Sequence, residues 1–196
     1  MSAERQLSNA IIIGSSIMLI SIMMVIFKLA WVLLYFIFLF PGFAFGLSLS
    51  SGYNEKGWKG VLFLFISGLS YMGCFWLMGI FHPGTETLID TAKVVGCSCL
   101  GALILSIAYQ FLLLNKFSWA RSLLCIVIVG IATCLPCAIC IYITLGNRVD
   151  TNSHVYVSTL LYAGIFTIYP LWQTAFVWVM NTERFKPVSE KTATAS

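Results

Sequence analysis

Residues 119–145 read WARSLLCIVIVGIATCLPCAICIYITL, a long apolar run in which Arg121 is the only charged residue. A helix of about 20 apolar residues is enough to cross the ~30 Å hydrocarbon core of a bilayer. The run therefore predicts one membrane-spanning helix. Short polar clusters bound it on both sides, and the same alternation of apolar runs and polar clusters continues along the chain.

The whole chain is as apolar in composition as a membrane protein. Hydrophobic residues make up 60% of the 196 residues, charged residues make up 9%, and the mean hydropathy is +0.95. Soluble domains carry about 25% charged residues. Because this chain has too few charges to cover a water-facing surface, we expect lipid to be its solvent.

Four segments bounded by polar turns have spanning length, namely 58–81, 88–114, 119–145 and 155–180. The stretch from Ala10 to Ser50 is too long for one crossing and carries a single charge, Lys28, near its middle. Either Lys28 lies in a tight hairpin between spans 9–27 and 29–50, or one span is preceded by an interfacial helix. We favour the hairpin, because each half then has spanning length.

The basic residues indicate an orientation, because cytoplasmic loops of membrane proteins are rich in Lys and Arg. Six spans with a cytoplasmic N-terminus place most of the 11 basic residues inside. The inside set is Arg5, Lys56, Lys59, Lys116, Arg121, Arg184, Lys186 and Lys191, and the outside set is Lys28, Lys93 and Arg148. We therefore expect an all-α, multi-pass protein of the cell membrane with six transmembrane helices and both termini cytoplasmic. Residues 1–181 form one domain, and 182–196 form a polar cytoplasmic tail.

Several classes of function are disfavoured by the sequence. The net charge of +4 follows from topology and anionic lipid, so no nucleic-acid partner is needed to explain it. A P-loop, a catalytic triad and a His-rich metal motif are all missing, so we expect neither an enzyme nor a bound cofactor. Carboxylates in the middle of a span are typical of proton pumps, and these spans have none, which disfavours a conventional ion-coupled pump.

The seven cysteines all fall within predicted spans, and three of them form the pattern Cys134-x-x-Cys137-x-x-Cys140. Structural zinc sites normally use four ligands, and no His or carboxylate lies near this pattern. We interpret the thiols as small, polarizable packing groups and predict no metal site. A redox or soft-metal role is the alternative.

Small residues and prolines predict how the helices pack. Gly42-x-x-x-Gly46 is a spacing that lets two membrane helices approach closely, so it predicts a helix contact, with an oligomer contact as the alternative. Pro41, Pro136 and Pro170 each lie inside a predicted span and are expected to kink it.

Uncharged polar side chains at membrane depth are the candidate pathway residues. They are Asn9, Ser67, Tyr71, Tyr109, Gln110, Thr133, Tyr169 and Gln173. Tyr71, Phe75 and Trp76 together suggest an aromatic constriction. The alternative is that about half of these polar groups only bond across helices.

Several local patterns occur in the order found in one family. The first predicted span opens Asn9-Ala-Ile-Ile-Ile-Gly14, the third contains Tyr71-Met-Gly73-Cys-Phe75-Trp76, and Phe40-Pro-Gly42 precedes Tyr53-Asn-Glu-Lys-Gly57. In these patterns the chain resembles a divergent member of the acetate uptake transporters, the succinate–acetate permease family. It departs from the family where two prolines of the first motif are missing, where Phe45 replaces a Gln, and where one residue is inserted in the third motif.

The resemblance implies a channel or transporter that passes acetate and similar small monocarboxylates, with succinate as a further candidate, through a pore in each protomer of a homo-hexamer. By the same resemblance, Asn9 and either Tyr71 or Ser67 bear on the pathway. From the residues alone we add Phe75 and Gln173 to the candidate pathway. The alternatives are a channel for small neutral solutes, such as urea, amides, ammonia or water, and a multispan adaptor that transports nothing.

Overall fold

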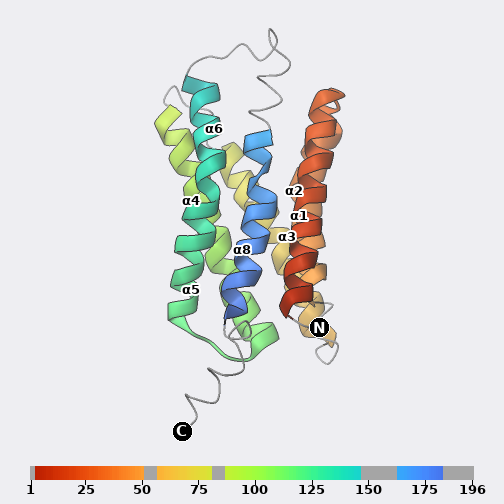
Figure 1. Ribbon diagram of the computed structural model, residues 1–196, viewed down its shortest axis with the longest axis vertical. Coiled ribbons are helices and arrows are strands. Elements are labelled where there is room, and N and C mark those ends of the chain that lie inside the picture. Colours follow the sequence, from red (N-terminus) through yellow and green to blue (C-terminus); the bar gives the residue numbers. More distant parts are fainter. Residues whose placement is uncertain (1–2, 51–56, 81–86, 147–162, 183–196) are drawn as a thin grey trace.

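The computed structural model describes residues 3–50, 57–80, 87–146 and 163–182, and within these ranges the chain is helical apart from short turns. The helices lie side by side in an elongated bundle and run alternately up and down (Figure 1). Helix α1 begins and helix α8 ends at the same end of the bundle (Figure 1). We refer to this end as the lower end, as it is drawn, and to the opposite end as the upper end.

The first apolar stretch folds into two helices, α1 (Ala3–Ile26) and α2 (Ala30–Ser50). Between them Lys28 adopts a left-handed conformation with φ 56°. The amide of Lys28 donates to the carbonyl of Val25 at 3.0 Å, and the amide of Leu29 donates to that of Met24 at 2.9 Å. These are the two bonds of a Schellman turn, which ends a helix abruptly. The hairpin predicted at Lys28 is therefore confirmed.

Helix α1 starts six residues before the predicted span 9–27. Its first residues are polar, and Glu4 lies in the first turn, where a negative charge interacts favourably with the helix dipole. Hydropathy identifies only the apolar part of a helix, so the span prediction did not include this polar N-terminal extension.

The next two helical segments match their predicted spans closely. Helix α3 covers Gly57–Ile80, and α4 covers Thr87–Tyr109. A short π-helix, η2 (Gln110–Leu114), continues α4 to the end of the predicted span at residue 114. Asn115 then turns the chain with φ 52° and ψ 26°, a conformation that Asn tolerates better than most residues.

The segment that opened the sequence analysis forms one rod of four parts. These are α5 (Trp119–Cys125), the π-helix η3 (Ile126–Ile131), the 3₁₀ turn η4 (Ala132–Cys134) and α6 (Leu135–Gly146). Pro136 explains the irregular middle, because proline has no N–H and its ring crowds the carbonyl four residues earlier. The hydroxyl of Thr133 donates to the carbonyl of Val129 at 2.6 Å within this region.

The last helical segment, residues 163–180, is also interrupted next to a proline. Residues 163–166 are helical, Thr167 is a turn residue, and α8 follows as Ile168–Met180. Pro170 lies just after this break. Residues 155–162 of the predicted span 155–180 lie outside the described residues.

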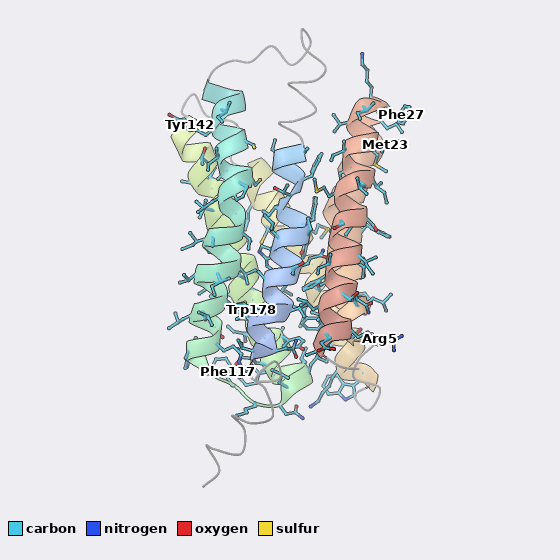
Figure 2. The ribbon with its side chains drawn as sticks, viewed as in Figure 1. Arg5, Met23, Phe27, Phe117, Tyr142 and Trp178 are labelled. Carbon is cyan, nitrogen blue, oxygen red and sulfur yellow. The ribbon has the colours of Figure 1, made fainter. Side chains whose placement is uncertain are left out.

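The outer surface of the bundle is suited to lipid. Four described helical segments are long and apolar enough to cross a membrane, namely Ala3–Ile26, Thr91–Leu114, Trp119–Cys140 and Ala163–Met180. Large apolar side chains are exposed along them, among them Leu19 (62%), Val127 (56%) and Ile139 (56%). Figure 2 shows Met23 and Phe27 at the upper end of α1 and Tyr142 on α6. An all-helical, multi-pass membrane protein accounts for this surface.

Two glycine contacts hold the bundle together tightly. A Cβ at Gly14 of α1 would lie 2.5 Å from the Cα of Pro170 in α8, and a Cβ at Gly42 of α2 would lie 2.9 Å from the Cα of Gly68 in α3. Gly46 approaches Leu64 of α3 equally closely. The Gly42-x-x-x-Gly46 motif therefore packs α2 against α3, as predicted.

We expect Gly14→Ala to lower the thermal stability of the purified protein, because the new methyl group meets backbone that no rotamer change can move. Overpacking of this kind costs about 1–3 kcal/mol. The matched control is Gly96→Ala in α4, where an added Cβ meets no atom within 4 Å and Ala favours the helix. Thermal unfolding in detergent measures both. Equal melting temperatures for the two variants would contradict the close α1–α8 contact.

Candidate solute cavity

A cavity of about 130 Å³ lies between α3, α4 and α8. Its lining residues are Tyr71, Cys74, Val94, Cys97, Ser98, Gly101, Leu105, Ile168, Tyr169 and Trp172. These positions fall near the middle of their helices, between the two ends of the bundle. A cavity of about 150 Å³ can hold benzene, so this one has room for a solute of a few heavy atoms or for several waters.

The lining is mostly apolar and contains no charged residue. Its polar atoms are hydroxyls and thiols. The thiol of Cys74 donates to the carbonyl of Cys97 at 3.3 Å, which leaves the hydroxyls of Tyr71, Ser98 and Tyr169 as the strongest hydrogen-bonding groups of the lining. Such a surface suits a small, mainly apolar solute with one polar end.

Three side chains at or beside the cavity carry buried polar atoms that are poorly paired. The hydroxyl of Tyr71 faces the side chain of Gln173, which is 0% exposed. Among the described residues, however, neither group has a hydrogen-bond partner of acceptable geometry, and neither does the hydroxyl of Ser98, which lies against the thiol of Cys134. A buried polar group without a partner costs about 1–3 kcal/mol. Groups of this kind typically pair with water or with a ligand.

An aromatic cluster continues from the cavity lining towards the lower end of α8. Trp172 lines the cavity and contacts Tyr71 edge-on, with ring centroids 5.7 Å apart. On its other sides it stacks on Phe176 at 5.5 Å and meets Phe45 edge-on at 5.9 Å. Phe45 and Phe176 are fully buried. We refer to Phe45, Trp172 and Phe176 as the aromatic floor.

The structure brings three of the predicted pathway residues to the cavity. Tyr71 and Tyr169 line it, and Gln173 lies beside it. Ser67 is buried in the α2–α3 contact, where its hydroxyl donates to the carbonyl of Gly42 at 2.7 Å. Asn9 is on α1, outside the cavity lining. Phe75 is on α3, but its side chain lies outside the described residues, so the constriction predicted from Tyr71, Phe75 and Trp76 is represented only by Tyr71.

Sequence reasoning missed Ser98 and Trp172, which contribute to the lining. Ser98 stands in the run Gly96-Cys-Ser-Cys-Leu-Gly101, whose small side chains leave space on α4. Only the small size of these residues could have indicated a cavity, and the same signal is equally typical of a helix contact.

Gln110, another candidate pathway residue, has a structural role. Its amide nitrogen donates to the hydroxyl of Ser122 at 2.9 Å, and its amide oxygen accepts from the backbone N–H of Ser118 at 2.7 Å. It thereby holds the turn at Asn115, whose amide oxygen accepts from Lys59 at 3.1 Å. This side chain is fully buried, and both of its polar atoms are hydrogen-bonded.

Two of the seven thiols line the cavity, and a third lies near it. Cys74 and Cys97 line it, and Cys134 donates weakly to the carbonyl of Val94 at 3.8 Å. Over the described ranges, no three Cys, His, Asp or Glu side chains are grouped so that they could hold a metal ion. In these contacts the thiols act as small packing groups.

No family model, curated protein or solved structure matches this chain.

Gln110 and Gln173 provide a direct test of which buried amide is paired. We expect Gln110→Leu to lower the melting temperature, because the N–H of Ser118 and the hydroxyl of Ser122 lose their partner, at a cost of about 1–3 kcal/mol. Gln173→Leu should leave the melting temperature unchanged or raise it, because an unpaired amide is replaced by an apolar group of similar size. Destabilisation of both variants to the same degree would show that Gln173 has a structural partner after all.

Proposed function

We propose that the protein carries small monocarboxylates such as acetate across the cell membrane, through a path in each protomer that includes the cavity. The observation that carries the proposal is the unpaired Tyr71 hydroxyl, which faces an unpaired Gln173 amide at the edge of a small, uncharged cavity. A carboxyl group can accept and donate hydrogen bonds, so it satisfies both groups at once.

The chemistry of the lining favours a weak acid. A carboxylic acid titrates near pH 4–5, so about one molecule in a few hundred is neutral at pH 7. Fixed positive charges are missing from the lining, so an anion would gain little compensation for its lost water. The protonated acid needs only hydroxyl and amide partners, and its methyl group suits the apolar wall. Succinate remains a further candidate substrate.

Six spans with both termini in the cytoplasm fit the distribution of charge. Among the described basic residues, Arg5, Lys59, Lys116 and Arg121 lie towards the lower end, while Lys28 and Lys93 lie towards the upper end. Trp58 and Trp119 begin the helices at the lower end and are 68% and 64% exposed. Tryptophan is common at membrane–water interfaces. We take the lower end as cytoplasmic.

The resemblance to the acetate uptake transporters supports the same substrate class and suggests a homo-hexamer. The cavity lies within a single chain, so the proposed path requires no residue from a neighbouring protomer. Asn9 stays a candidate pathway residue on the resemblance alone, at the end that we take as cytoplasmic.

A channel for small neutral solutes is the second candidate. The uncharged lining favours it as much as it favours a protonated acid. Competition separates the two: excess urea or acetamide inhibits acetate uptake only if these solutes share the path. A non-transporting adaptor would pass neither class of solute.

We expect proteoliposomes that contain the wild-type protein to take up labelled acetate. Tyr71→Phe should reduce uptake by up to about tenfold, because it removes one hydrogen bond worth about 1–1.5 kcal/mol but keeps the ring against Trp172. Tyr71→Ala should instead admit larger acids, because it opens the wall of the cavity.

The matched control is Tyr142→Phe on α6, which removes a hydroxyl from a side chain that is 52% exposed and absent from the cavity lining. It should transport acetate as the wild type does. Lack of acetate uptake by the wild type would refute the proposed substrate. Equal uptake by Tyr71→Phe and Tyr142→Phe would remove Tyr71 from the path.

A further inference from the structure

Gly101 of α4 is buried and lines the cavity. A Cβ built on it would lie 3.4 Å from the Sγ of Cys74 in α3 and 4.0 Å from the Cζ2 of Trp172 in α8. Both of these side chains also line the cavity. The side chain that glycine lacks would therefore project into the cavity, between the walls that α3 and α8 contribute.

The close glycine contacts between helices differ from this one. At Gly14 and Gly42 a Cβ would lie less than 3.0 Å from backbone atoms of the facing helix, so a larger residue does not fit there. At Gly101 the nearest atoms are at ordinary van der Waals distance, so alanine fits without displacing a neighbour. Alanine also forms helix better than glycine. Helix packing and helix stability therefore do not require glycine at this position, and its clear consequence is a larger cavity.

The wall around Gly101 is mainly apolar. It includes the thiol of Cys74, the indole ring of Trp172 from the aromatic floor, and Leu105, one turn further along α4. Under the proposed function the carboxyl group of the substrate bonds to the Tyr71 hydroxyl, so the alkyl chain occupies the rest of the cavity and reaches this wall. Benzene fits a cavity of about 150 Å³ and has as many non-hydrogen atoms as butyric acid. An acid of this size therefore nearly fills the cavity of about 130 Å³.

We propose that Gly101 sets the size limit of the substrate, so that the wild-type protein passes acetate, propionate and butyrate. This inference rests on the proposed function and adds to it the residue that determines specificity. One methylene group more or less in an apolar pocket changes selectivity by about 10–200-fold. A methyl group added at Gly101 takes the space of the end of the longer chain, so it selects against butyrate and spares acetate.

Uptake of labelled acetate and butyrate into proteoliposomes tests this role, after subtraction of the uptake by protein-free vesicles. We expect Gly101→Ala to lower the ratio of butyrate to acetate uptake by about tenfold or more, and to leave the melting temperature unchanged or higher. Gly96→Ala is the matched control on the same helix, because an added Cβ there meets no atom within 4 Å and Gly96 is absent from the lining. Its uptake ratio should equal that of the wild type.

A compensating change separates lost volume from a change in the helix itself. Cys74→Ala removes the Sγ that lies nearest to the added methyl group. The double variant Gly101→Ala/Cys74→Ala should therefore regain most of the butyrate uptake, whereas an altered helix would not be corrected in this way. If Gly101→Ala alone does not fold, Cys74→Ala decides, because it enlarges the cavity at the same wall and should raise the ratio of butyrate to acetate uptake.

An unchanged ratio in Gly101→Ala, with acetate uptake intact, would overturn the role of Gly101 and leave the proposed function standing. The same measurement with acetamide and butyramide covers the neutral solutes. Loss of butyramide uptake in Gly101→Ala, together with a wild type that takes up no acid, would keep Gly101 as the size determinant and refute the proposed substrate. Uptake of neither series by the wild type would overturn both.

Discussion

A polar group inside a bilayer must find its partner within the protein, because hydrocarbon offers none. The helices satisfy this requirement for the main chain, and several side chains satisfy it for themselves. Ser67 bonds to Gly42, and Gln110 bonds to Ser118 and Ser122. Tyr71 and Gln173 are among the few described side chains with a buried polar atom that makes no such bond, and they lie together at the cavity. A solute or water that completes their hydrogen bonds gives their burial a physical reason.

The cavity exists because the neighbouring helices pack closely while the side chains that α4 contributes to the lining are small. Gly14 brings α1 onto α8, and Gly42 brings α2 onto α3, so these helices leave little space between them. On the facing side of α4, Ser98 and Gly101 are too small to fill the volume in front of Trp172. The aromatic contacts of Trp172 and the small side chains of α4 therefore leave a space between them that no side chain fills.

Hydropathy predicted where the helices lie, because the cost of placing charge in lipid restricts polar residues to a few short turns. It also predicted the hairpin at Lys28, the one charge in a long apolar stretch. It could not distinguish Gln110 from Gln173. Both are fully buried amides in apolar helices, and only the faces that α5 and α3 present to them decide which one is paired. Ser98 was not predicted to line a cavity for the same reason, since small residues are found both in cavity linings and at helix contacts.

The account depends on a polar solute or water between Tyr71 and Gln173. An experimental density map of the protein in a lipid nanodisc, recorded with and without acetate, tests this most directly. We predict separate density in the cavity within hydrogen-bond distance of the Tyr71 hydroxyl, with a shape that changes when acetate is added. A direct hydrogen bond between the two side chains, with an empty cavity under both conditions, would contradict the account.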